Sequence, residues 1–188
     1  MSEPEYTDRG ATFSPCGLYR YRLWRYWQGG PDTSPLPVVW LMLNPSTADA
    51  EKLDPTIRRC VNFARAWGHN GVEIVNLFAY RATDPNAMRE AAKTRDVIGP
   101  DNDAAILDAC RMAGIVVMAY GEHGRLRGRG FEVAALLRNG GVRVLHYLKL
   151  TKAGHPTHPL YQPADSRLVK MTLRPRTDGL EDWEVVQT

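Results

Sequence analysis

The chain has 188 residues, of which 44% are hydrophobic and 24% are charged, and its formal net charge is +3. This length and balance are ordinary for one globular domain with a sizeable core. No apolar run approaches the roughly 18 residues that cross a bilayer, so we expect no membrane-spanning segment. The small positive charge permits a nucleic-acid partner without requiring one.

The N-terminal segment and the cysteines indicate a cellular compartment. Residues 1–10, MSEPEYTDRG, are polar and partly acidic, unlike a signal peptide. Cys16, Cys60 and Cys110 lie far apart in the sequence, in a spacing typical of neither a zinc site nor a disulfide framework. We therefore expect reduced thiols in a cytoplasmic protein.

The N-terminal part, residues 1–36, contains the stretch GLYRYRLWRYWQGG. Its aromatic and basic residues alternate with a period of two from Tyr19, which predicts one or two antiparallel strands ending at Gly29 and Gly30. Two interpretations of this β-hairpin extension stay open. It is either an edge hairpin with solvated arginines or a basic, aromatic surface suited to phosphate and base contact.

Four apolar runs follow, near residues 38–43, 72–77, 115–120 and 142–148. The first of them, PVVWLML, is apolar on both faces, as strands inside a parallel sheet are. The four runs alternate with helical stretches, which is the pattern of a parallel sheet covered by helices on both faces. We therefore predict one α/β domain over residues 1–188, a three-layer sandwich with a central, mainly parallel four-stranded sheet in a core of residues 37–163.

The helical stretches have recognisable ends. In DPTIRRCVNFARAWG, Asp54 stands at the capping position, Pro55 at the first helical position and Gly68 just past the end. DPNAMREAAK, GPDNDAAILDACRMAG and RGRGFEVAALLRNGG are predicted as the other helices. From Lys149 the chain is irregular and proline-rich, and a short strand near WEVVQ is predicted in the C-terminal tail, residues 164–188.

Polar groups follow each of the four strands, and ligands of open α/β sheets bind outside the carboxyl ends of the strands. The groups are Asn44-Pro45, Asn76, the segment YGEHGRLRGRG and the segment GHPTHPLY, in strand order. Each also has a structural interpretation. Asn44 fits a residue that hydrogen-bonds its own turn, and Asn76 fits a satisfied core amide. The glycine-arginine segment fits a solvated loop, and His155 and His158 fit surface imidazoles.

Familiar cofactor and catalytic motifs are missing from the sequence. It contains no dinucleotide-binding glycine fingerprint, no P-loop, no nucleophile elbow and no H-E-x-x-H pattern. The histidines lack metal-ligand spacing with a nearby carboxylate or thiolate, so we expect no metal and no cofactor. A site made of amides, histidines and arginines suits a planar polar ligand and an anion.

Five ordered motifs between about Tyr19 and Pro163 resemble a known family. LMLNPSTAD, DPTIRRCVNFARAWG, VNLFAYRATDP, GPDNDAAI and HPLY are similar, segment by segment, to the bacterial and phage domain-of-unknown-function family sixteen-forty-three. That family name carries no activity, so the motifs need their own interpretation.

The same motifs resemble, more loosely, the uracil-DNA glycosylase superfamily. The matching residues are Leu43-Asn44-Pro45 in the motif that ends the first strand, Asn76, Arg81 and Asp84-Pro85 in the second motif, and His158-Pro159-Leu160 in the late motif, with His155-Pro156 as a competitor. Three features depart from the superfamily pattern. Met42 stands where glycine is usual, no apolar DNA-wedging side chain is identifiable, and the cysteines of the iron–sulfur members are missing.

This second resemblance implies a uracil-DNA-glycosylase-like fold and a role for each matching residue. Asn44 would hold the attacking water and His158 would stabilise the departing base, because the base leaves as an anion while the sugar gains oxocarbenium character. Asn76 would read the base edge, with further base contacts from Tyr80, His155 and Tyr161. The phosphate contacts would come from Arg81, Arg125, Arg127 and Arg129.

The expected function is recognition of a base in a nucleic acid, most of all in DNA. In the catalytic form of this hypothesis, the protein also hydrolyses the N-glycosidic bond of an extruded or modified base. Two alternatives stay open. One is a non-catalytic reader of a modified base or nucleotide, and the other is an enzyme that acts on free nucleotides or nucleosides. No Asp or Glu stands at the end of the first strand, which counts against the catalytic form.

Overall fold

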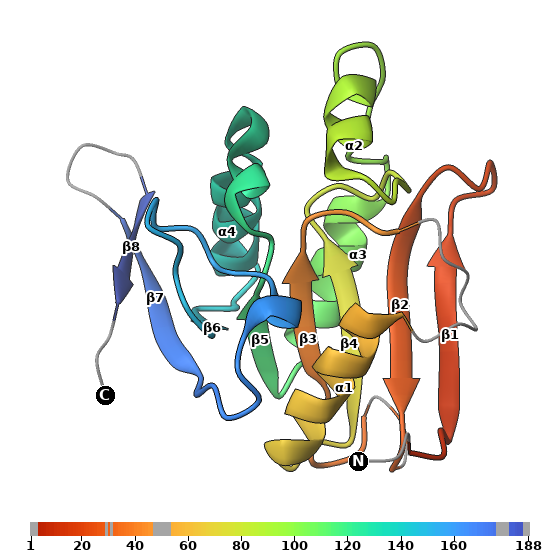
Figure 1. Cartoon of the computed structure of the whole chain (residues 1–188), viewed down its shortest axis with the longest axis vertical. Helices are drawn as coiled ribbons and strands as arrows, with labels where there is room; N and C mark the ends of the chain where they lie inside the picture. The colour runs from red at the N-terminus through yellow and green to blue at the C-terminus, as the bar shows by residue number, and fades with distance from the viewer. Residues whose placement is uncertain (1–3, 29, 31, 47–53, 176–180, 186–188) are drawn as a thin grey trace.

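The computed structural model describes residues 4–28, 30, 32–46, 54–175 and 181–185, with side chains up to residue 171. Within them, eight strands form one sheet in the order β1-β2-β4-β3-β5-β6-β7-β8 (Figure 1). The strands are β1 Asp8–Phe13, β2 Arg20–Tyr26, β3 Val38–Met42, β4 Gly71–Asn76, β5 Ile115–Met118, β6 Val144–Tyr147, β7 Val169–Pro175 and β8 Glu181–Val185. The helices are α1 Pro55–Ala66, α2 Pro85–Ala91, α3 Asn102–Arg111 and α4 Arg129–Asn139, with 3-10 segments η1 Glu122–Gly128 and η2 Pro159–Tyr161.

The four apolar runs form the centre of the sheet. They are β3, β4, β5 and β6, which pair in parallel in the spatial order β4-β3-β5-β6. The prediction of one parallel group of four strands is confirmed. The register places Val38 opposite Val72 and Met42 opposite Asn76. The last residues of β3 and β4 therefore reach the same edge of the sheet, where the site lies.

The sheet itself is larger than the predicted four strands. β2 pairs antiparallel with β4, and β1 with β2, so the N-terminal hairpin belongs to the main sheet and is not an extension beside it. At the other side, β7 pairs antiparallel with β6, and β8 pairs with β7. β8 lies where the terminal strand was predicted. Which strands join a sheet depends on tertiary packing more than on local pattern, and this is why the total was underestimated.

Helices cover both faces of the sheet. Figure 1 shows α1 on one face and α3 with α4 on the other. Along β3, Val39 and Leu41 pack in one buried cluster, which includes Ile106 of α3 and Leu137 of α4. Trp40 packs in the other cluster, with residues of α1. The alternation explains why β3 is apolar on both faces.

Helix α1 begins and ends as its sequence predicts. The Asp54 carboxylate accepts a 2.8 Å hydrogen bond from the backbone N–H of Ile57, and Pro55 is the first helical residue. Gly68, just past the end, has a φ of +79°, a conformation that glycine adopts without strain. Asp54 is thereby fixed in position at the start of α1, on the side of the helix that meets the site.

Strand β2 buries charged side chains, against the interpretation of an edge hairpin with solvated arginines. β2 lies between β1 and β4, and Arg20 and Arg25 are only 4% and 1% exposed. Arg22 forms a 2.6 Å ion pair with Glu73, a buried carboxylate inside β4 that also accepts a hydrogen bond from the Tyr26 hydroxyl. The alternation along β2 therefore separates two covered faces and does not separate core from solvent.

Cys16, Cys60 and Cys110 are free thiols, as predicted, with Cys60 and Cys110 buried. Burial raises the pKa of both buried thiols. Among the described residues, none of the helices combines the length and the apolar character needed to cross a membrane.

Candidate functional site

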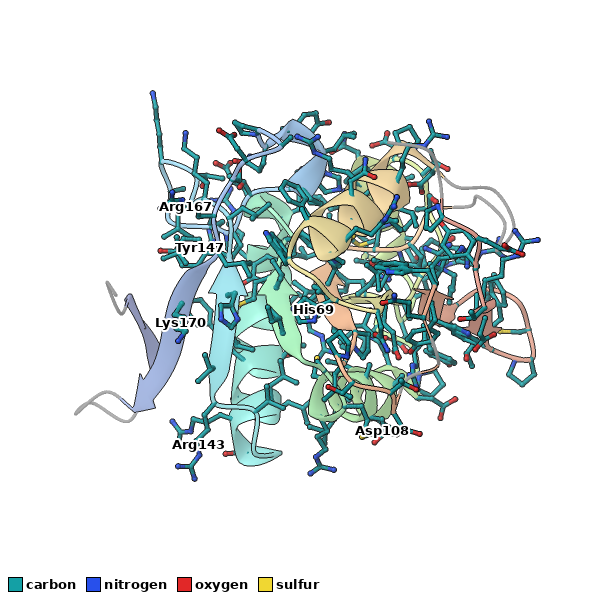
Figure 2. All side chains as sticks on the ribbon, turned by 90° about the horizontal axis from the view of Figure 1, so that it is seen from below. His69, Asp108, Arg143, Tyr147, Arg167 and Lys170 are labelled. Carbon is teal, nitrogen blue, oxygen red and sulfur yellow. The ribbon has the colours of Figure 1, made fainter. Side chains whose placement is uncertain are left out.

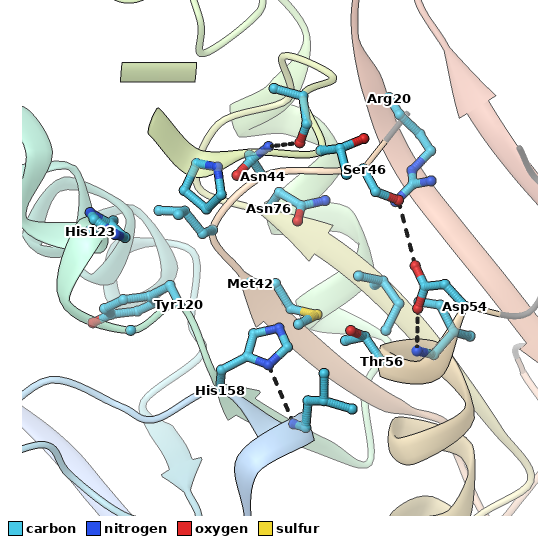
Figure 3. Close-up of a pocket in the computed structure, with 18 of the residues that line it drawn as sticks. Arg20, Met42, Asn44, Ser46, Asp54, Thr56, Asn76, Tyr120, His123 and His158 are labelled. Atoms are coloured by element: carbon cyan, nitrogen blue, oxygen red, sulfur yellow. Dashed lines mark hydrogen bonds between the residues drawn. The ribbon is translucent and has the colours of Figure 1, made fainter. Parts of the chain in front are cut away.

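A cavity of about 460 Å³ opens at the carboxyl ends of β3, β4 and β5, the edge at which polar groups were predicted to converge. Four of the predicted site residues line it: Asn44, Asn76, His158 and Tyr161. Its other polar lining residues include Arg20, Ser46, Asp54, Thr56 and His123 (Figure 3). The cavity lies within the size range of about 300–1,000 Å³ that is usual for small-molecule sites.

Asn76 is the most unusual polar residue in the cavity. It ends β4, it is only 2% exposed, and its side chain points into the cavity (Figure 3). Its backbone carbonyl accepts a 3.0 Å hydrogen bond from Asn102. No hydrogen bond joins its side-chain amide to another residue that the structure describes. Asn76 is not among the described residues with a fully buried, unpartnered side-chain polar atom, so its amide can be reached from the cavity and can hydrogen-bond to a ligand there.

His158 presents one ring nitrogen to the cavity. It precedes η2, and its Nδ1 accepts a 3.3 Å hydrogen bond from the backbone N–H of Leu160. With Nδ1 as the acceptor, the neutral imidazole carries its proton on Nε2, which points into the cavity in Figure 3. Burial lowers the pKa of His158, and the Asp54 carboxylate opposes this shift. The ring therefore offers a neutral N–H donor near pH 7.

Asn44 forms hydrogen bonds within the protein, which was the structural one of the two interpretations of this residue. Its Nδ2 donates hydrogen bonds to the carbonyl oxygens of Ala82, at 2.7 Å, and Pro45, at 3.2 Å. The first bond joins the loop after β3 to the loop after β4. Among the described residues, the Oδ1 atom has no such contact, so it is the part of the amide that can accept a hydrogen bond from a water or a ligand.

Two charged residues of the cavity were missed by the sequence analysis. Asp54 lines the cavity while capping α1, and its second oxygen lies 3.5 Å from the Ser46 hydroxyl. Arg20 reaches the cavity from β2, and burial lowers its pKa to about 10, a shift opposed by Asp54. The helix-cap pattern did identify Asp54, but only as a structural residue. Nothing in the period-two pattern of β2 separates Arg20 from its neighbours.

The charges of the lining residues that the structure describes nearly cancel. Arg20 and Asp54 carry opposite charges, and His158 is neutral near pH 7 for the reason given above. Tyr120, which also lines the cavity, keeps its proton because burial raises its pKa. The lining therefore offers several hydrogen-bond donors and acceptors with little net charge, an arrangement that suits a neutral polar ligand.

Residues 20–160 match the model of the family described as "Protein of unknown function (DUF1643)". The match covers well over half of the chain. The chain belongs to this family. It is the same family that the five sequence motifs resemble. No curated protein and no solved structure matches the chain.

The DUF1643 match contains most of the cavity. It begins at Arg20 and ends at Leu160, and it includes Asn44, Asp54, Asn76 and His158 among the lining residues. It leaves out Tyr161, the strands β7 and β8, and β1. The part of the chain that defines the family therefore supplies the polar groups of the site.

Two predicted base contacts of this DUF1643 chain lie outside the cavity. The Tyr80 ring packs edge-on against Tyr19, with centroids 6.4 Å apart, and the Arg95 guanidinium lies over it. His155 is in the loop before η2, where its backbone N–H donates to the Thr151 hydroxyl at 3.3 Å. Between the two competing histidines, it is His158 that lines the cavity.

The four arginines predicted to bind phosphate also lie outside the cavity lining. Arg81 donates to the Gly17 carbonyl at 3.1 Å, and Arg127 donates to the carbonyl of Ala92. Arg129 is 3% exposed. Its guanidinium donates to the Leu77 carbonyl at 3.0 Å and pairs with Asp103. Of these four arginines, Arg125 and Arg127 are exposed. The Arg125 side chain forms no hydrogen bond or ion pair with a residue that the structure describes.

The glycine-arginine segment contains short helical turns, with non-helical backbone at Leu126 and Arg127. Residues 122–128 form η1, and Arg129 is the first residue of α4. The segment brings His123 to the cavity. Within the described residues, no group of three or more histidine, cysteine or acidic side chains is arranged to hold a metal ion.

Proposed function

We propose that this cavity binds a nucleobase, and that the protein recognises that base in a nucleic acid or a nucleotide. The buried amide of Asn76 carries the proposal. An asparagine amide offers a donor beside an acceptor, so it can pair with an adjacent acceptor and donor on the Watson–Crick edge of a base. A base in the cavity would supply the hydrogen bonds that Asn76 does not make with the described residues.

The other lining groups fit the same ligand. The Nε2–H of His158 suits a carbonyl oxygen on the ring of a base, and the near-cancelling charges of Arg20 and Asp54 suit a ligand part that is itself uncharged. The size of the cavity leaves room for a base with its sugar. The looser resemblance to the uracil-DNA glycosylase superfamily, with its implied fold, agrees with this ligand class and remains part of the proposal.

A specific feature favours hydrolysis of the N-glycosidic bond over simple recognition. The sequence shows no carboxylate at the end of β3, but the Asp54 carboxylate lines the cavity from the start of α1. In this reaction the oxygen of a water bonds to C1′ of the sugar, and the C1′–N bond breaks with its electron pair passing to the base. Asp54 takes the proton of the water, Asn44 Oδ1 holds that water, and His158 Nε2–H donates to the leaving base.

The experiment is binding and abasic-site formation on oligonucleotides that carry uracil, hypoxanthine, hydroxymethyluracil or another modified base. The proposal predicts that wild type binds at least one of them, or the corresponding nucleoside, and that Asn76→Ala weakens this binding at least tenfold. The control is Asn139→Ala, which removes an exposed amide at the end of α4 and should leave the binding unchanged. Tight binding without base release after long incubation would identify a reader. Equal binding by wild type and Asn76→Ala would contradict the proposal.

A further inference from the structure

A second hollow lies beside the cavity, and the two share Tyr161. This hollow has a volume of about 690 Å³ and is lined by residues between Leu148 and Arg167; we call it the 149–167 groove. Three of its lining residues, Lys149, Lys152 and Arg167, are cationic, and all three are exposed. None of its described lining residues is acidic. Asp165 is the one carboxylate in residues 149–167, and it does not line the groove.

The backbone around the cations is held by hydrogen bonds. Thr157 donates to the Lys149 carbonyl through both its backbone N–H and its hydroxyl, each at 2.9 Å. The backbone N–H of Thr151 donates to the His155 carbonyl at 2.8 Å. Near the far end, the Ser166 hydroxyl donates to the Pro163 carbonyl at 2.8 Å. The three cations therefore stand on a loop with a defined shape, although the loop has little regular secondary structure.

The cavity and the groove differ in charge. In the cavity, Arg20 and Asp54 balance each other, which suits an uncharged group. In the groove, the cations have no carboxylate beside them in the lining, which suits anions. A nucleotide unit in a nucleic acid has both parts, an uncharged base and a charged phosphate, joined by a sugar.

Tyr161 stands where the two hollows meet. Its side chain is the most exposed of the large hydrophobic residues described, at 79%, and its ring centroid lies 5.6 Å from that of His158. An exposed ring of this kind is a surface on which a base can stack. A base inside a duplex is already stacked on both faces, so an exposed ring at this position favours a strand whose bases are unpaired.

We propose that the 149–167 groove binds the phosphodiester backbone of an unpaired nucleic-acid strand, one base of which enters the cavity while its neighbour stacks on Tyr161. This inference rests on the proposed function of the cavity, and it selects a strand over a free nucleotide. It also places phosphate contacts on Lys149, Lys152 and Arg167, which the sequence analysis did not consider.

The test compares two double variants that remove the same number of charges. Lys149→Ala/Arg167→Ala removes two groove cations. Arg111→Ala/Arg143→Ala removes two exposed arginines elsewhere, and Arg143 lies well apart from Arg167 in Figure 2. The probes are single-stranded DNA and RNA oligonucleotides of about 12 nucleotides, their duplexes, and the free nucleosides. Affinity is measured over a range of salt concentrations.

We expect the groove variant to bind single strands about tenfold more weakly and to lose about 1.4 from the slope of log affinity against log salt, the value for two phosphate contacts. The control variant should keep both values, and Tyr161→Ala should weaken strand binding further. Nucleoside binding should not change in the groove variant. Equal losses in the two double variants, an unchanged slope, or tighter binding of duplex than of single strand would each overturn the inference.

The measurements distinguish an incorrect inference about the groove from an incorrect proposal about the cavity. If single strands bind in a way that depends on the groove but not on Asn76, the groove stands and the proposed base site fails. If nucleosides bind in a way that depends on Asn76 but oligonucleotides do not bind, the inference about the groove fails and the cavity serves a free nucleotide. If no nucleic acid binds, the inference is overturned.

Discussion

The side-chain amide of Asn44 donates a 2.7 Å hydrogen bond to the backbone carbonyl of Ala82, 38 positions further along the chain. This bond connects the loop after β3 to the loop after β4, the two loops that form one side of the cavity. The first role of this amide, directly after a buried strand, is therefore to hold the two loops of the site together. The Oδ1 atom that remains is the part assigned to a water in the proposed reaction.

Replacement of Asn44 should therefore reduce stability as well as activity. Asn44→Ala removes two donated hydrogen bonds, and we expect a loss of about 1–3 kcal/mol in the free energy of unfolding, measured by urea denaturation. Asn44→Asp has nearly the same shape but places a carboxylate against two carbonyl oxygens, so it should destabilise at least as much. Unchanged urea midpoints in both variants would show that the bond to Ala82 has no structural role. In the catalytic form of the proposal, Asn44→Ala also lowers the cleavage rate about 10²-fold while affinity changes only a few-fold.

Arg129 should behave as a structural residue. Arg129→Ala removes a hydrogen bond to the Leu77 carbonyl, which keeps a 3.2 Å bond from Asn102, and the ion pair with the half-exposed Asp103, so we expect a loss of about 1–3 kcal/mol. Arg125→Ala is the matched control, because Arg125 is exposed in the neighbouring segment η1 and should change stability by less than about 0.5 kcal/mol. Urea denaturation of both variants distinguishes the roles. If Arg129→Ala were as stable as wild type and bound nucleic acid with a lower salt slope, the phosphate role first assigned to Arg129 would be supported.

Asp54 has two roles that a conservative substitution separates. Asparagine caps helices as well as aspartate does, so Asp54→Asn should keep the contribution of the cap, which Asp54→Ala should lose at a cost of about 1 kcal/mol. Asparagine cannot accept a proton from water, so in a catalytic protein Asp54→Asn should lower base release by about 10²-fold. The measurements are urea denaturation and abasic-site formation. Full cleavage activity in Asp54→Asn would remove Asp54 from the proposed reaction.

Stability should fall in mildly acidic solution. Burial lowers the pKa of His146 and His158 below the value of 6.5 expected in the unfolded chain. Between the folded and unfolded pKa values the unfolded state binds more protons, so the free energy of unfolding decreases as the pH falls through 6.5 and levels off below the folded pKa values. Protonation also places a hydrogen on His158 Nδ1, which then no longer accepts from Leu160.

The variant His158→Asn tests this pH dependence, because asparagine can still accept the Leu160 N–H but does not titrate. Urea denaturation at about pH 7.5 and about pH 5.5 should show a smaller difference between the two conditions for the variant than for wild type. A variant that loses as much stability as wild type would exclude His158 as a contributor.

Local signals predicted the parts of the fold that depend on local chemistry. The cap at Asp54, the proline after it and Gly68 define α1 without any tertiary information, and the run that became β3 is apolar on both faces. The convergence of Asn44, Asn76 and His158 followed from topology, since parallel strands deliver their carboxyl ends to one edge.

The missed features depend on contacts between distant segments. Arg20 and Arg22 follow the same alternation in sequence, yet the Arg20 side chain is buried at the cavity and Arg22 pairs with Glu73, because β2 lies inside the sheet. Arg129 was grouped with Arg125 and Arg127 by composition, but the start of α4 carries it into contact with Leu77. A sequence pattern gives the spacing of charges along a strand or loop, whereas burial is decided by the segment that packs against it.

The claim that the Asn76 side-chain amide binds a base is tested most directly by a crystal structure of the protein soaked with a nucleoside that binds in solution. We predict a base in the cavity at the end of β4, with its edge hydrogen-bonded to the Asn76 amide at about 2.7–3.2 Å and one of its oxygens near His158 Nε2. A base bound elsewhere, with the Asn76 amide hydrogen-bonded only to other protein groups, would contradict the claim.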